Sequence, residues 1–183
     1  MRRPTKILLT TQMIAVGAAG MLVPIYAIYV EKIGGDILAA AGAWTVFSIV
    51  SGALMMLFGR LTDRVREPEY FIVAGFFAAA VGYVGYLFVQ SPTHLFIVQM
   101  VLGVSVALMT PAHDALYTEH LDGGRFASEW GFWEGMWNIT EAAAALAGGL
   151  VVVWFGFKAL FMIMALLAFS TGVYVCVLPR RVL

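Results

Sequence analysis

Residues 38–58 read LAAAGAWTVFSIVSGALMMLF, an apolar run that contains no charged side chain. A helix that crosses a hydrocarbon core of about 30 Å needs about 20 such residues, because it rises about 1.5 Å per residue. Five further runs of this kind are present. We therefore expect an all-α membrane protein, a single domain over residues 1–183 with six transmembrane helices at about 7–30, 38–58, 70–89, 95–116, 131–154 and 159–178.

The composition agrees with a lipid environment. The chain is 62% apolar and 12% charged, whereas soluble domains are about 45 to 50% apolar and about 25% charged. The 11 basic and 11 acidic residues balance, so no basic excess points to nucleic acid as a partner. Cys176 is the single cysteine, which excludes an intrachain disulfide, and no Cys/His group has the spacing of a zinc site. We predict no metal and no cofactor.

The basic residues predict the orientation of the chain. Short loops rich in Lys and Arg stay in the cytoplasm, and one set of helix ends carries nine basic residues against two at the other. We therefore expect a multi-pass protein of the cell membrane, plasma or inner, with both termini cytoplasmic. The nine are Arg2, Arg3, Lys6, Arg60, Arg64, Arg66, Arg125, Arg180 and Arg181, and the two are Lys32 and Lys158.

Polar side chains inside the spans form stripes on single helix faces. A charged side chain at bilayer depth costs roughly 2.5 to 3.5 kcal/mol, so it usually faces a protein interior or a water-filled cavity. The mid-span carboxyl of Glu141 either stays protonated or meets a cation. The candidates to line a substrate cavity or an interface are Glu134, Trp137, Asn138 and Glu141 of the fifth span, Gln99 of the fourth, and Gln12 and Tyr26 of the first.

The distribution of charge predicts which helices face lipid and where charged residues gather. The spans at 70–89 and 159–178 hold no charged residue, so we expect these two helices to face mainly lipid. Asp114, Glu119 and Arg125 are candidates for a charge network at the cytoplasmic edge. The alternative for the polar stripes is that these side chains only hydrogen-bond between packed helices and serve assembly.

The connector between the second and third spans carries a motif. Residues 59–64 read GRLTDR, and Gly59, Leu61, Asp63 and Arg64 resemble the loop signature of the major facilitator superfamily. We expect Gly59 to end the second helix and Asp63 to lie at the positive N-terminal end of the third. The sequence departs from the signature at Arg66, where the family has a second glycine.

The resemblance covers the whole chain and is best to the family's N-terminal six-helix half. It implies half of a major facilitator fold, in which helices one, two, four and five line the cavity or the interface. It also implies a secondary transporter that works by alternating access. The family's fourth-helix arginine would fall near Gln99, and the fifth-helix Gly-Pro of its antiporters near Ala144 and Ala145, so neither feature is kept.

A complete transporter of this family has two six-helix bundles related by an axis along the membrane normal. The second bundle could be a parallel second copy of this chain, a separately encoded half, or the rest of a longer protein. The alternative function is a membrane assembly or regulatory protein that does not transport. No Ser/His or Cys/His pair, phosphate loop or HExxH sequence suggests an enzyme. The substrate is an unspecified small molecule, with a proton or another cation as a candidate coupling ion.

Overall fold

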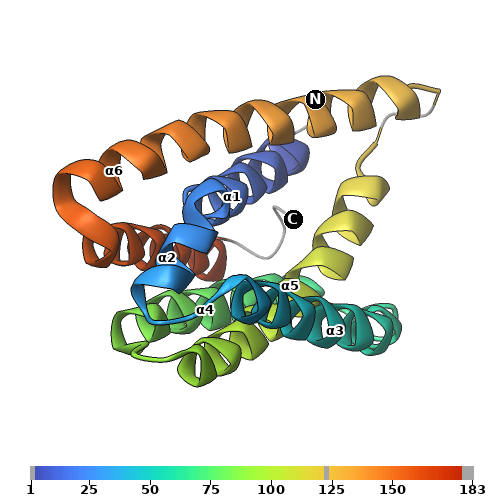
Figure 1. Cartoon of the computed structure of the whole chain (residues 1–183). Coiled ribbons are helices and arrows are strands. Elements are labelled where there is room, and N and C mark those ends of the chain that lie inside the picture. The colour runs from blue at the N-terminus through green and yellow to red at the C-terminus, as the bar shows by residue number, and fades with distance from the viewer. Residues whose placement is uncertain (1–2, 122–123, 179–183) are drawn as a thin grey trace.

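The computed structural model describes residues 3–121 and 124–178, and those ranges are helical with no strand (Figure 1). Arg2, Arg180 and Arg181, which entered the orientation argument, lie outside the described residues. The elements are α1 (Arg3–Gly20), η1 (Val23–Ile25), α2 (Tyr26–Lys32), α3 (Ile37–Thr62), α4 (Glu69–Gly85), η2 (Tyr86–Phe88), α5 (Pro92–Glu119) and α6 (Phe126–Val177).

The last helix, α6, contains two helical rods, the first at residues 126–155 and the second at residues 157–177. Its 52 residues would extend about 78 Å as one straight helix, more than twice the thickness of a hydrocarbon core of about 30 Å. Gly156 interrupts it with φ +80° and ψ 173°, and the chain reverses there (Figure 1). Within the described residues, five helical stretches are long and apolar enough to cross a membrane, and α6 is long enough for two crossings. The all-α six-helix class is therefore confirmed.

The turn at Gly156 gives a first prediction. Its backbone angles fall in a region that only glycine occupies readily, at a cost of about 1–3 kcal/mol for other residues. We expect Gly156→Ala to lower the free energy of unfolding in detergent by about this amount. Gly135→Ala is the control, because a methyl group there meets nothing within 4 Å and Ala favours a helix. Equal stability of the two variants would contradict the prediction.

The first predicted span, 7–30, is not continuous. The α-helix ends at Gly20, a 3-10 turn over Val23–Ile25 follows, and α2 begins at Tyr26. Pro24 lies in this turn, where it lacks a backbone N–H to continue a helix. Backbone that leaves the helical hydrogen-bond ladder is tolerated at membrane depth only inside protein or beside a cavity. Met21 and Leu22 are buried, whereas Val23 of the 3-10 turn is 48% exposed.

The helices form two layers joined by α4. Figure 1 shows α1 beside the first rod of α6 in one layer and α3 beside α5 in the other, and α4 contacts both α5 and α6. Gly148 of α6 lies against the backbone of Met21, the residue that follows α1. Small residues at such contacts let two helix backbones approach in a membrane.

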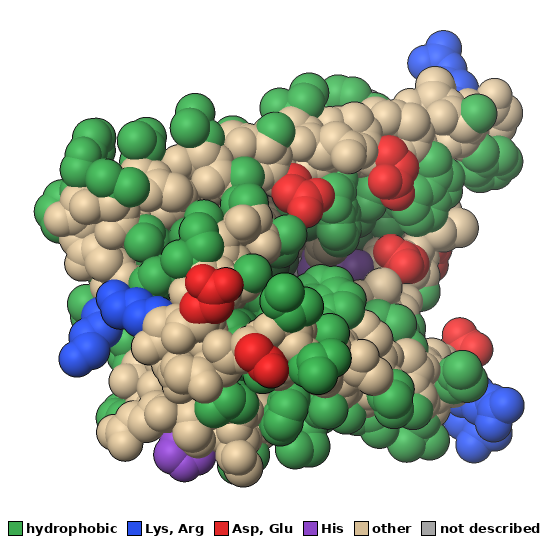
Figure 2. Space-filling model, viewed as in Figure 1, with side chains coloured by type: hydrophobic (Ala, Val, Ile, Leu, Met, Phe, Trp, Pro, Cys, Tyr) green, Lys and Arg blue, Asp and Glu red, His purple; other side chains and the backbone are tan. Residues whose placement is uncertain are grey.

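Two elements leave most of their apolar surface uncovered. On α3, Ile49 is 65% exposed and Met56 74%, while on the first rod of α6 Ile139 is 66% exposed and Leu146 69%. Large exposed apolar surfaces mark contact with lipid or with another protein. Figure 2 shows basic side chains at the two ends of the molecule, and acidic side chains both beside the hollow between the layers and nearer those ends.

Candidate functional site

A cavity of about 540 Å³ lies between the two layers. This volume falls within the range of about 300–1,000 Å³ that small-molecule sites occupy. All the long helices, α1 and α3 to α6, contribute to its wall. Five of the predicted residues lie in that wall, namely Gln12, Tyr26, Gln99, Trp137 and Glu141.

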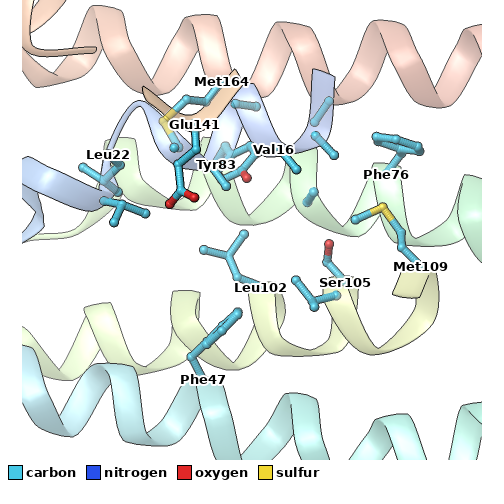
Figure 3. A pocket seen from close by; sticks show the side chains of 18 of the residues that line it. Val16, Leu22, Phe47, Phe76, Tyr83, Leu102, Ser105, Met109, Glu141 and Met164 are labelled. Atoms are coloured by element: carbon cyan, nitrogen blue, oxygen red, sulfur yellow. The ribbon is translucent and has the colours of Figure 1, made fainter. Parts of the chain in front are cut away.

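Glu141 is the residue that α1 and α6 position together. It lies near the middle of the first rod of α6, and its carboxylate projects into the cavity (Figure 3). A Cβ added at Gly20 would lie 3.4 Å from Cγ of Glu141 and 3.3 Å from Cβ of Ala144. Glycine at position 20 therefore lets the carboxyl stem pass beside α1. No hydrogen bond or ion pair joins Glu141 to another residue in the described part of the chain.

Gln99 ties α5 to α2 at one end of the cavity. Its Nε2 donates to the hydroxyl of Tyr26 at 2.7 Å and to that of Tyr86 at 3.4 Å. The Tyr29 hydroxyl in turn donates to the backbone oxygen of Tyr86 at 3.2 Å. The rings of Tyr86 and Phe161 stack with centroids 4.7 Å apart. Tyr29, Tyr86 and Phe161 thus form a buried aromatic cluster. This cluster lies at the end of the bundle that contains α2 and η2.

The third and sixth spans contribute more to the cavity than expected. Phe76, Tyr83 and Tyr86 come from α4 and η2, and Met164 and Ala168 come from the second rod of α6. The expectation that these helices face mainly lipid is therefore wrong. It rested on the absence of charge, but apolar and aromatic side chains form most of this wall.

The other two fifth-span candidates lie elsewhere. Glu134 and Asn138 are exposed and do not line the cavity, and the Asn138 amide donates to the Glu134 backbone oxygen at 2.8 Å. Glu134 lies about two helical turns, and Asn138 about one turn, from Glu141 toward the Phe126 end of α6. The polar stripe therefore divides into a cavity part and an exposed part.

The loop motif differs from its expected geometry. Helix α3 continues through Gly59 to Thr62, so Gly59 does not end it. Asp63 caps the C-terminus of α3, with its backbone N–H donating to the Gly59 oxygen at 3.1 Å. Because α4 begins at Glu69, Asp63 does not lie at its N-terminus. Leu61, Asp63 and Arg64 are all exposed.

The proposed charge network is not assembled. Asp114, Glu119 and Arg125 are each exposed, and no ion pair joins the three in the described ranges. The charged group with which Asp114 does interact is another carboxylate, Glu134 of α6. Among residues 3–121 and 124–178, no group of three or more His, Cys, Asp or Glu side chains is placed to hold a metal ion.

Comparison with known proteins identifies the family. The model of the major facilitator superfamily matches residues 8–182, so the chain belongs to that superfamily. Multidrug resistance protein MdtG of Erwinia billingiae (strain Eb661) is 26% identical over 178 residues, which cover 95% of this chain and 43% of that protein. MdtG of Serratia proteamaculans (strain 568) is 26% identical over 171 residues, 91% of this chain and 41% of that protein.

A third relative is shorter. The MFS-type transporter YitZ of Bacillus subtilis (strain 168) is 24% identical over 155 residues, which cover 85% of this chain and 94% of YitZ. The chain thus spans less than half the length of the MdtG relatives. With the family match, its helices correspond to half of a major facilitator fold. It is a multi-pass membrane protein of a transporter family and not an enzyme.

Proposed function

We propose that this chain moves a small solute across the membrane by alternating access, as one of two six-helix bundles. The observation that carries the proposal is the cavity of about 540 Å³ between the layers, with the Glu141 carboxylate in its wall. A cavity at mid-membrane with a convergent polar group is the arrangement expected of a solute site in this class of transporter.

The uncovered surfaces of α3 and the first rod of α6 support pairing with a second bundle. Trp44 of α3 and Trp137 of α6 both line the cavity, and Trp44 is still 53% exposed. A second bundle on this side would cover the exposed apolar residues and complete the cavity wall. A parallel second copy of this chain meets the requirement, as does a different six-helix half.

Alternating access can be tested without knowing the solute. We expect Val106→Cys, made in a Cys176→Ser background, to react with a membrane-impermeant thiol reagent from both sides of sealed vesicles. Val106 lies at the middle of α5 and lines the cavity. The control is Leu166→Cys, whose parent side chain is 67% exposed near the middle of the second rod and lies outside the cavity, and which should react from neither side.

The two functions predict different labelling. A transporter exposes position 106 to each side in turn, so both vesicle orientations are labelled. An assembly or regulatory protein with one fixed conformation exposes it to one side at most. If Val106→Cys is labelled from the same side of the membrane in right-side-out and in inside-out vesicles, the result therefore favours the non-transporting alternative.

The proposed orientation gives a separate prediction. Arg66 and Gln90 are both exposed and lie in connectors at opposite ends of α4 and η2. With both termini cytoplasmic, we expect Gln90→Cys to react in intact right-side-out vesicles and Arg66→Cys to react only after lysis. The measurement is labelling by an impermeant maleimide in the Cys176→Ser background. The reverse pattern would place both termini outside.

A further inference from the structure

The cavity wall carries one kind of charge. Among the described residues that line it, Glu141 is the single acidic one, and none is Lys, Arg or His. The Glu141 carboxylate has no hydrogen-bond or ion-pair partner among the described residues. Glu141 is half-buried in a wall that is mostly apolar. An ionised carboxyl there is stabilised by a paired cation, so the ionised form favours positive charge and disfavours negative charge in the cavity.

Four aromatic side chains line the same cavity as this carboxylate. Trp44 and Phe47 of α3, Tyr83 of α4 and Trp137 of α6 all belong to the wall. Figure 3 shows Phe47 and Tyr83 on different sides of the space into which Glu141 points. The face of an aromatic ring attracts a cation and also packs against apolar groups. The wall therefore suits an organic cation better than a small hydrated ion.

The uncharged polar groups add hydrogen-bond acceptors. Gln99 already uses its amide nitrogen to donate to Tyr26 and Tyr86, so its carbonyl oxygen remains for a ligand. Gln12 also lines the cavity, and its Oε1 is buried without a hydrogen-bond partner. These oxygens match the N–H groups of an amine.

We propose that the cavity binds a lipophilic organic cation, with its positive centre at Glu141 and its apolar body against the aromatic wall. This inference rests on the proposed function and specifies the chemical class of the solute. The wall offers an anion no compensating positive charge. Selection among solutes of the same shape therefore depends on the sign of their charge.

The test uses two probes of the same shape and opposite charge, tetraphenylphosphonium and tetraphenylborate. Binding to the purified chain in detergent is followed by tryptophan fluorescence, since two of the five tryptophans, Trp44 and Trp137, line the cavity. We expect the phosphonium to bind, and its affinity to fall at least about tenfold in Glu141→Gln. Glu31→Gln is the control, because Glu31 is an exposed acid of α2 outside the cavity, and it should bind like the parent.

Two results would overturn the proposal. One is equal phosphonium affinity in the parent and in Glu141→Gln. The other is a parent protein that binds the borate as tightly as the phosphonium, a comparison that needs no variant to fold. Either result, together with labelling of Val106→Cys from both sides, would refute the cation site and leave the transport proposal standing.

Discussion

Replacing Gly148 by valine is expected to prevent formation of a stable bundle. A Cβ at this position would overlap the backbone C, O and Cα atoms of Met21. Because the overlap is with backbone, no side-chain rotation can relieve it, and the segment at the end of α1 must move away from α6. Overpacking costs typically 1–3 kcal/mol and sometimes more, and we expect about 3 kcal/mol or more here.

The neighbouring glycine supplies a matched control. A Cβ at Gly149 meets nothing within 4 Å, so Gly149→Val changes the same helix by the same atoms without the overlap. Thermal unfolding in a mild detergent should show a large loss of stability for the first variant and a small change for the second. If both variants unfold at the temperature of the parent, the close approach of α1 to α6 is wrong.

Asp63→Asn is expected to slow transport about tenfold or more while leaving solute affinity unchanged. Asp63 is exposed at the C-terminus of α3 and does not line the cavity, so it cannot contact a bound solute. Its place in the family signature links it to the movement between conformations. Tetraphenylphosphonium provides both readouts, as uptake into vesicles and as equilibrium binding.

The control for Asp63→Asn lies at the other end of the same helix. Asp36 caps the N-terminus of α3 by accepting from the Ala39 N–H at 2.8 Å, and asparagine caps a helix about as well. Asp36→Asn should therefore retain both uptake and binding. Affinity that falls in parallel with the uptake rate of Asp63→Asn would assign Asp63 a role in binding instead.

The helices were predictable because lipid imposes a simple length and composition on them. The apolar runs at 38–58 and 95–116 correspond to α3 and α5, which extend to Thr62 and Glu119. Hydropathy cannot locate such ends, because polar residues also continue a helix beyond the hydrocarbon. The break between Gly20 and Tyr26 was missed because its residues are apolar, although Pro24 was a signal.

The site was predictable only where polarity marks it. A helical projection at 100° per residue places Trp137 and Glu141 on one face of the predicted fifth span. Both residues line the cavity. The same rule included Glu134 and Asn138, because a helical projection carries no information on where a neighbouring helix ends or diverges. Phe76 and Ala79 were missed since apolar side chains give no polar signal, and only the packing of α4 between the layers brings them into the wall.

The reversal at Gly156 affects how this part of the chain can be handled and made. The two rods of α6 are joined without an extended segment, and the flanking Trp154 and Phe155 are 69% and 70% exposed. Proteolysis and the insertion of tags require an exposed, extended loop. The turn at Gly156 should therefore resist proteolysis and should not tolerate an inserted epitope tag. During synthesis, the two rods should enter the bilayer together as one helical hairpin.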